Sequence, residues 1–271
     1  YKRQVLGVGE GEVFLASDSA AILEYTNKMI FLENGDFVEI NDGNFTLYDI
    51  EKNVITRDIQ VIDWEVSEAE KAGHDHFMYK EILEQAEVIE RTIAGRIEKN
   101  STEIPIHLDK AKKFEKIWIV ACGTAYHAGL FGKDLFEKVL GVPVSVELAS
   151  EFRYREPIIG KNDLAIVISQ SGETMDTIAA TELLKENGSH VLALVNVVGS
   201  SLARMADSVF YLHVGPEIGV ASTKAYLGML VGQLLLAKHW DSNNKLDTSL
   251  EEIKALPYLI EEALKCEDQV K

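Results

Sequence analysis

From about residue 115 onward, short apolar runs alternate with longer segments of helical periodicity. The apolar runs are "KIWIVA", "VPVSVELA", "LAIVIS", "VLALVN" and "SVFYLHV", and segments such as "AYHAGLFGKDLFEKVL" and "TMDTIAATELLKEN" lie between them. Uninterrupted apolar runs joined by helices indicate a parallel sheet buried on both faces, because parallel strands need crossover connections. The pattern therefore predicts an α/β domain with a five-stranded, doubly wound, flavodoxin-like parallel sheet.

Residues 1 to about 63 show a different pattern, with short alternating runs broken by turn residues. In "MIFLENGDFVEINDGNFTLYD" the Asn34-Gly35 pair lies between two alternating segments, and Asp42-Gly43 supplies a second turn signal. Such pairs are the strongest short-range indication of a β-hairpin. We predict a small antiparallel meander here, with hairpins at both turns.

Between these parts, the acidic stretch from about 64 to 76 predicts a linker. It leads into "MYKEILEQAEVIERTIAGRI", where apolar residues recur at roughly helical spacing: Ile82, Val88, Ile89, Ile93 and Ile97. This spacing predicts an amphipathic helix. The end of the chain, from about 247 to 271, predicts a helix interrupted near Pro257. His74 and His76 form an H-x-H pair, but no third metal ligand is in sight, so we favour exposed linker histidines.

The net charge of -17 at pH 7 repels polyanions. It argues against a nucleic-acid or anionic-membrane partner, although a small anion can still bind locally. The most apolar long run, "VASTKAYLGMLVGQLLLA", contains Lys224 and Gln233 and fits a buried helix better than a membrane span or signal peptide. The two cysteines, Cys122 and Cys266, match no zinc spacing and favour a reducing compartment, so we expect a soluble, cytoplasmic protein.

Three strand-to-helix junctions in the second part of the chain are rich in small and hydroxyl residues: "ACGTAYHAG", "VISQSGETMDT" and "GPEIGVASTKA". Junctions at the carboxyl ends of parallel strands meet at one edge of the sheet, where ligands bind. A helix start offers unpaired N–H groups and a positive dipole end, so it can hold a phosphate without lysine. The hydroxyls add neutral donors.

A simpler interpretation of the second junction is that Ser171 is an N-cap and Thr174 a first-turn residue. Capping needs fewer hydroxyls than Ser169, Gln170, Ser171 and Thr174 supply, and two further loops open on the same edge. We therefore favour a phosphate site. No G-x-x-x-x-G-K-[ST] motif is present, and "LGVGEG" lacks the G-x-G-x-x-G spacing, so both nucleotide-binding motifs are excluded.

The sequence offers little for catalysis. Glu217, Lys224 and Glu173 are polar residues near the predicted site, but a helix-end charge or an ion pair explains each of them equally well. His127 follows the first junction, and an ordinary half-buried histidine is the favoured interpretation. Asp176 lies in the first turn of its helix, where the dipole alone favours negative charge.

With these motifs in view, the chain resembles the glucosamine-6-phosphate synthase family, the isomerising glutamine:fructose-6-phosphate aminotransferases. The resemblance rests on "CGTAYHAG", "ELASEFRYR", "SQSGETMDT", "NVVGSSLARMADS" and "EIGVASTKA", which occur in the order of the family's first sugar isomerase (SIS) domain. Upstream, "VFLASDSAAILEYTNKMIFLENGDFVEI" is similar to the end of the family's glutaminase domain. "HFMYKEILEQ" is similar to the helix after its linker.

The resemblance implies three parts: 1–63 as the remnant of an N-terminal glutaminase (Ntn-type) domain, 64–100 as a linker and amphipathic helix, and 101–271 as the first SIS domain. In the family, glutamine-derived ammonia converts fructose 6-phosphate into glucosamine 6-phosphate without a cofactor. The glutaminase cysteine and the second SIS domain, which supplies the isomerising glutamate and imine-forming lysine, would lie outside this chain. Because the chain opens on Tyr1, we expect a piece of a longer protein that is inactive alone, with no catalytic residue in this part.

By motif position, the resemblance implies that the phosphate is bound by Thr124, Ser169, Gln170, Ser171 and Thr174, and that Val220 and Ser222 contact the sugar. Two positions depart from the family pattern. Ala125 stands where serine is usual, which removes one hydroxyl from the pocket. Ala86 stands where proline is usual, which concerns the linker helix more than the site.

Two rival hypotheses remain open. The first is a non-catalytic SIS sensor that binds an amino-sugar phosphate and regulates a partner. The upstream meander argues against it, because a sensor would not need a glutaminase remnant. The second is a stand-alone sugar-phosphate isomerase, which would need Glu217 or Glu173 as its base. For the favoured hypothesis we expect a homodimer, because SIS proteins commonly build their sites near subunit contacts.

Overall fold

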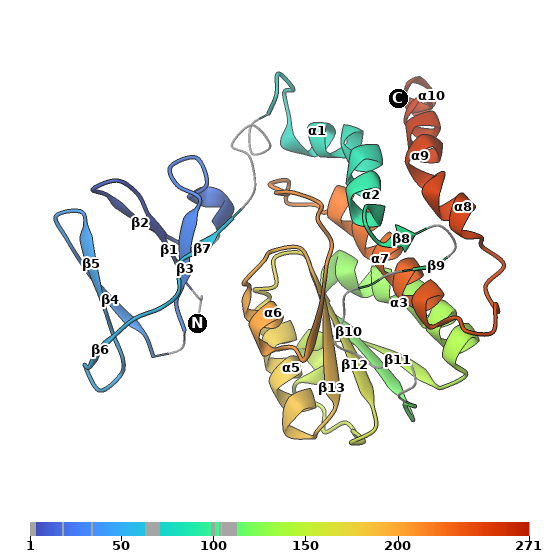
Figure 1. The fold of residues 1–271 in the computed structure, drawn as a ribbon, viewed down its shortest axis with the longest axis horizontal. Helices are drawn as coiled ribbons and strands as arrows, with labels where there is room; N and C mark the ends of the chain where they lie inside the picture. The colour runs from blue at the N-terminus through green and yellow to red at the C-terminus, as the bar shows by residue number, and fades with distance from the viewer. Residues whose placement is uncertain are drawn as a thin grey trace. The chain divides into compact units, whose positions relative to one another are not determined.

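The computed structural model describes residues 4–270 except 18, 34, 63–70, 99–100, 103 and 105–112. The chain divides into two compact units, Tyr1–Phe77 and Met78–Lys271 (Figure 1). Much of the predicted linker lies outside the described residues, so its conformation stays a prediction.

The first unit is built from antiparallel strands, as its alternating pattern predicts. β1 (Val5–Val8), β2 (Val13–Ala16), β3 (Lys28–Phe31) and β7 (Gln60–Val61) form one sheet in the order β2-β1-β3-β7. β4 (Phe37–Asn41), β5 (Asn44–Tyr48) and β6 (Val54–Ile55) form a second sheet, and the short 3-10 helix η1 spans Ser19–Ala21. A small core contains Leu6, Ile30, Leu32 and Leu47.

One of the two predicted hairpins is confirmed and the other is wrong. Asn41 of β4 pairs with Asn44 of β5, and the two residues between them, Asp42 and Gly43, have φ of 45° and 76°, as a tight hairpin turn requires. At the Asn34-Gly35 signal, however, β3 pairs with β1 and β7. Both edges of β3 are therefore occupied, and β4 joins a different sheet. Asn34 itself lies outside the described residues.

The second unit begins with the predicted amphipathic helix, which is divided into α1 (Phe77–Leu83) and α2 (Gln85–Ile93). Val88, Ile89 and Ile93 are buried, as predicted. The helix does not extend to Ile97, because Gly95 takes a φ of 70° just beyond the helix end. Ile97 belongs instead to β8 (Ile97–Glu98), which pairs with β9 (Ser101–Thr102).

The predicted five-stranded parallel sheet is present. It consists of β10 (Ile117–Ala121), β11 (Val144–Leu148), β12 (Leu164–Ser169), β13 (His190–Val195) and β14 (Ser208–Tyr211). The strand order is β11-β10-β12-β13-β14, and every neighbouring pair is parallel. In chain order this is the 2-1-3-4-5 arrangement of flavodoxin-like folds, so the predicted topology is confirmed.

Helices cover both faces of this sheet because alternate strand residues point to opposite sides. Ile119 and Ile166 pack in one core with α3 (Gly123–Leu140) and α7 (Lys224–Trp240). Trp118 and Val167 pack in the other core with α4 (Ala149–Phe152), α5 (Met175–Glu186) and α6 (Ser201–Met205). Each fully buried aliphatic side chain of this kind contributes about 1.5–3 kcal/mol.

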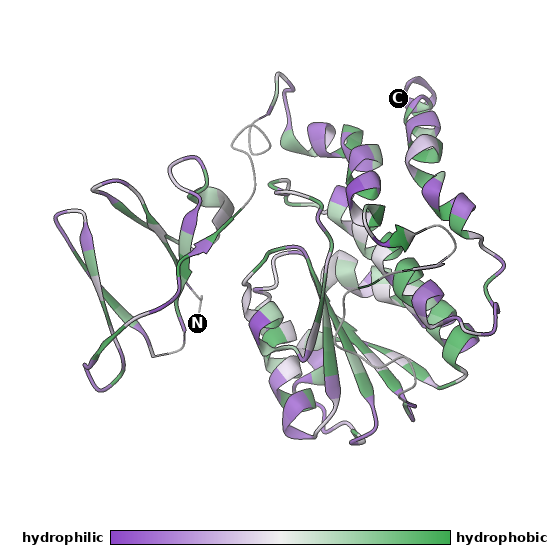
Figure 2. Ribbon diagram, viewed as in Figure 1, coloured by the Kyte–Doolittle hydropathy of each residue, from purple (hydrophilic) through white to green (hydrophobic). Residues whose placement is uncertain are grey.

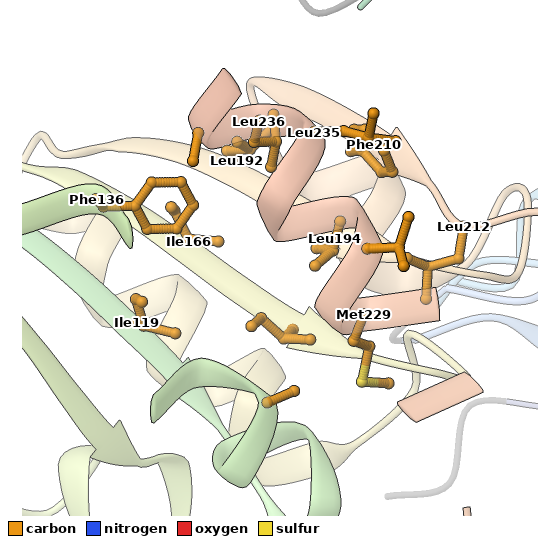
Figure 3. Packing of buried hydrophobic residues seen from close by; sticks show 14 of the residues in the cluster. Ile119, Phe136, Ile166, Leu192, Leu194, Phe210, Leu212, Met229, Leu235 and Leu236 are labelled. Atoms are coloured by element: carbon orange, nitrogen blue, oxygen red, sulfur yellow. The ribbon is translucent and has the colours of Figure 1, made fainter. Parts of the chain in front are cut away.

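Figure 3 shows the first of these cores, where Met229 and Leu235 of α7 lie over the strand residues. The strands are correspondingly the most hydrophobic part of the ribbon in Figure 2. The chain ends in α8 (Leu250–Lys254), α9 (Leu256–Leu264) and α10 (Glu267–Val270). The predicted interruption is confirmed, because Pro257 lies in the first turn of α9, where a missing N–H costs no helical hydrogen bond. Every helix within the described residues is too short or too polar to span a bilayer.

Candidate functional site

A cavity of about 450 Å³ lies where the chain leaves β10 and β12, and the loop before α7 completes its wall. All seven residues predicted from the sequence line it: Thr124, Ser169, Gln170, Ser171, Thr174, Val220 and Ser222. Their assembly follows from the topology, because β10 and β12 are neighbours and their carboxyl ends meet at one edge.

The loop after β12 is organised around the hydroxyl of Ser169, the last residue of the strand. Ser169 Oγ accepts a hydrogen bond from the Gly172 amide at 3.1 Å and lies 3.0 Å from Thr174 Oγ1. Ser171 Oγ accepts from the Glu173 amide at 3.1 Å. These short-range bonds hold three hydroxyls on the cavity wall with little freedom.

The simple capping interpretation of this loop is wrong in its residue assignment. Thr174, not Ser171, stands at the N-cap of α5, with φ -66° and ψ 112°, and its side chain makes no capping bond within the described structure. The first-turn N–H groups of α5 are those that an α-helix leaves without an intrahelical partner. They remain available to an acceptor outside the helix.

Gly172 gives the loop its sharp turn. Its φ is 66°, and a Cβ at this position would lie 2.1 Å from Ser200 Oγ. The backbone on either side is anchored to the neighbouring junction, since the Leu202 amide donates to the Gly172 carbonyl and the Asn196 amide donates to the Gln170 carbonyl, each at 3.1 Å. Only glycine satisfies both the conformation and the space.

Glu173, considered above as a base, has a structural role. Its carboxylate accepts from the Ser201 amide at 2.7 Å and from the Ser201 hydroxyl at 2.6 Å. It therefore caps α6, and it is not among the residues that line the cavity. A carboxylate at a helix start is stabilised by the unpaired amides and the dipole. Asp176, also considered above, pairs with Arg153 at 2.8 Å.

The junction after β10 contributes a second helix start. Cys122 is the N-cap of α3 in an extended conformation, and it makes no capping bond through its side chain among the described residues. Gly123, with φ of 57°, and the exposed Thr124 follow it on the cavity wall. Ala125 also lines the cavity and is only 6% exposed. His127 is exposed and is not one of the lining residues.

The third helix start, at α7, is filled by the protein's own carboxylate. Glu217 accepts from the Thr223 amide at 2.9 Å and the Ala225 amide at 3.1 Å. Its other oxygen accepts from Ser222 Oγ at 2.8 Å, which fixes the direction of that hydroxyl. Glu217 lines the cavity, but its hydrogen bonds are those of a helix cap.

Buried charges lie near α1 and this loop; the ion-pair interpretation of Lys224 is confirmed, whereas sequence reasoning missed Glu81. Lys224 is 1% exposed and pairs with Glu84 at 2.6 Å. Glu81 is 2% exposed and accepts from the amides of Ile218 and Gly219 at 2.6 and 3.0 Å. Charged residues on an amphipathic helix ordinarily face solvent, so the sequence carried no signal for this contact.

The cavity has an unusual charge balance for an anion site. Among the described residues no lysine or arginine lines it, and Glu217, the single acidic residue among those that do, is engaged with α7. Positive potential must come from the open starts of α3 and α5, supplemented by neutral hydroxyl donors. The described residues contain no group of three or more His, Cys, Asp or Glu side chains placed to hold a metal ion. Chemically, the arrangement suits one phosphate group attached to a hydroxyl-bearing ligand.

Comparisons with known proteins agree with this arrangement. The SIS domain model matches residues 110–238. A Clostridium tetani protein named glutamine–fructose-6-phosphate aminotransferase (isomerising) is 44% identical over 98% of this chain, which spans 46% of that protein. A Thermus thermophilus protein of the same name is 42% identical over 96% of this chain, which spans 44% of it. The chain therefore spans less than half the length of these relatives.

Among solved structures, the C-terminal domain of glucosamine-fructose-6-phosphate aminotransferase from Francisella tularensis matches with a TM-score of 0.64 and 35% identity. The match covers 74% of this chain and 59% of that one. The resemblance inferred from the order of the motifs is thereby confirmed. Residues 110–238 form a SIS domain, in a chain related by sequence to the isomerising glutamine–fructose-6-phosphate aminotransferases.

Proposed function

We propose that the cavity binds a sugar phosphate, with the phosphate at the starts of α3 and α5. Thr124, Ser169, Gln170, Ser171 and Thr174 supply its donors, and Val220 and Ser222 contact the sugar. The observation that carries this proposal is the difference between the helix starts: Glu217 fills that of α7, whereas no side chain of the described structure caps α3 or α5. An anion fits where the protein has supplied none of its own.

The names of the relatives suggest which sugar phosphate. We propose that this chain is the phosphosugar-binding part of an isomerising aminotransferase, which forms glucosamine 6-phosphate from fructose 6-phosphate and glutamine-derived ammonia, the first step of amino-sugar biosynthesis. We also propose a glutaminase remnant over 1–63, a linker and helix over 64–100, and the SIS domain over 101–271; the division between the two compact units, at Phe77 and Met78, falls within the second of these parts. We further propose a homodimer in the cytoplasm, where free thiols such as Cys122 and Cys266 stay reduced.

The test is calorimetric titration of the chain with fructose 6-phosphate, glucosamine 6-phosphate and unphosphorylated fructose. A Ser171→Ala/Thr174→Ala double variant removes two cavity hydroxyls. A Ser189→Ala variant is the matched control, because Ser189 is buried at the opposite end of β13. We expect both phosphorylated sugars to bind wild type and the control, and the double variant to bind at least about tenfold more weakly.

Fructose should bind far more weakly than its phosphate. Equal binding of fructose and fructose 6-phosphate, or undiminished binding by the double variant, would contradict the phosphate site. Failure of a folded wild-type chain to bind either phosphorylated sugar would contradict the proposed function of this chain as a phosphosugar-binding unit.

A further inference from the structure

The loop from Glu217 to Ser222 forms part of the cavity wall without regular secondary structure. A wall segment that contributes to binding must be held by other bonds, because backbone N–H groups removed from water need partners. Two carboxylates supply them on either side of Val220. On the C-terminal side, Glu217 accepts from Ser222 Oγ and from the Thr223 amide.

On the N-terminal side, the partner is Glu81 of α1, which is 137 positions away from Ile218 in the chain. A single oxygen, Glu81 Oε1, accepts from the amides of both Ile218 and Gly219. The side chain is almost completely buried, and Glu81 Oε2 has no hydrogen-bond partner among the described residues. The two amide hydrogen bonds to Oε1 offset part of the cost of burying this carboxylate, and they tie the loop to α1.

The fit around Gly219 is close. A Cβ at Gly219 would lie 2.5 Å from Glu81 Oε2, and Gly219 itself lines the cavity. A side chain at this position would therefore have to displace the Glu81 carboxylate from its present place. Glu84, just after α1, links this helix to α7, because it pairs with Lys224 of α7 at 2.6 Å. Glu84 also pairs with Lys80 of α1 at 3.3 Å. Glu81 thus projects from a fixed base.

We propose that Glu81 is a positioning residue, which holds the 217–222 loop so that Val220 and Ser222 meet the sugar portion of a bound sugar phosphate. This inference rests on the proposed function. It separates the cavity into two ends: the starts of α3 and α5 bind the phosphate independently of Glu81, whereas the sugar end depends on it.

The test compares two ligands on the full chain. Fructose 6-phosphate carries both the phosphate and the sugar, whereas glycerol 3-phosphate carries the phosphate without most of the sugar. For Glu81→Ala, we expect affinity for fructose 6-phosphate to fall about tenfold, while affinity for glycerol 3-phosphate stays within about twofold of wild type. Glu81→Gln retains an acceptor oxygen and should recover most of the loss. Glu87→Ala, on the exposed face of α2, is the matched control and should behave as wild type.

Hydrogen exchange supplies a direct readout, because the amides of Ile218 and Gly219 should exchange faster in Glu81→Ala than in wild type. Gly219→Ala disturbs the same contact from the side of the loop. It should reproduce the selective loss of affinity for fructose 6-phosphate even if Glu81→Ala does not fold.

If Glu81→Ala lost affinity for both ligands equally, or if its affinities and its amide exchange were unchanged, the positioning role would be overturned. If the wild-type chain bound neither ligand, the proposed function would be overturned, and so would the role of Glu81 in binding. Wild-type binding that Glu81→Ala and Gly219→Ala leave intact would overturn the inference about Glu81 alone.

Discussion

Ser169 Oγ and Thr174 Oγ1 lie 3.0 Å apart, joining the end of β12 to the N-cap of α5. Neither hydroxyl caps the helix that follows. Instead, the pair bridges the turn, and both residues line the cavity. Under the proposed function these hydroxyls serve the ligand rather than the helix, and the first prediction follows from this.

Replacing Ser169 with alanine should weaken sugar-phosphate binding more than it weakens the fold. The change removes the acceptor for the Gly172 amide and the partner of Thr174. We expect affinity for fructose 6-phosphate to fall at least about tenfold and the free energy of unfolding to fall by about 1 kcal/mol. Titration calorimetry and urea unfolding measure the two effects. A large loss of stability with unchanged affinity would show that the hydroxyl serves only the fold.

Gly172→Ala should be strongly destabilising. The substituted residue would need a φ of 66° and would bring its methyl group to 2.1 Å from Ser200 Oγ, so we expect a loss of roughly 2–5 kcal/mol in urea unfolding. Gly188→Ala is the control, because its φ of 86° is also positive but its nearest contact is 3.4 Å. It should lose only about 1 kcal/mol.

Adding Ser200→Gly to Gly172→Ala should restore part of the lost stability by removing the clash. An additive or larger loss in the double variant would show that the clash is not the cause.

Cys122 should be protected by ligand. It is half-buried and lines the cavity, whereas Cys266 is exposed near the end of the chain and is not a lining residue. Saturating fructose 6-phosphate should slow alkylation of Cys122 by iodoacetamide several-fold and leave Cys266 unchanged, as measured by peptide mass spectrometry. Equal slowing at both thiols would indicate a general effect of the solution rather than occupancy of the cavity.

The chain by itself should not isomerise fructose 6-phosphate to glucose 6-phosphate. The two carboxylates that such a reaction would need, Glu173 and Glu217, are engaged in capping α6 and α7. A dehydrogenase-coupled assay should detect no glucose 6-phosphate above the buffer background. Activity that disappears in Glu173→Gln or Glu217→Gln would revive the stand-alone isomerase hypothesis.

Asp241 should make stability depend on pH in the acid range. Burial alone would raise its pKa, but hydrogen bonds from the Leu246 and Lys245 amides and the nearby Lys238 ammonium lower it below 3.8. An acid with a lowered folded-state pKa stabilises the fold above its unfolded value of 3.8, and this contribution is lost as pH falls through the folded-state pKa.

Asp241→Asn should therefore be less stable than wild type at pH 7, and the difference in urea unfolding should narrow below about pH 4. Asp134→Asn, on the exposed face of α3, is the control. A difference that stays constant with pH would rule out the charge of Asp241 as its source.

The sheet and cavity were predictable because they depend on strong, local signals. Buried runs such as Leu164–Ser169 mark parallel strands, and the topology then brings Thr124 and Ser171 to one edge whatever the details of the loops. The pairing of β3 was not predictable from the Asn34-Gly35 signal, because a turn pair cannot show that both edges of the preceding strand are already occupied.

The role of Glu81 escaped sequence reasoning, whereas the helix-end interpretation of Glu173 and Glu217 is confirmed, although the sequence did not favour it over the alternatives. Each carboxylate binds backbone amides of a distant or irregular segment, and amides carry no sequence signature. An acidic residue that caps a neighbouring element has the same local pattern as one that faces solvent or serves as a base. Only the fold distinguishes them.

The carboxylate of Glu217 at the start of α7 has a consequence for ligand choice. A sugar that carried phosphates at both ends could place one of them at α3 and α5, but its second phosphate would approach a fixed negative charge on the cavity wall. Like charges at short range repel one another. If the cavity binds a sugar phosphate as proposed, it should therefore bind monophosphates more tightly than bisphosphates, because the carboxylate that caps α7 also limits the charge of the ligand.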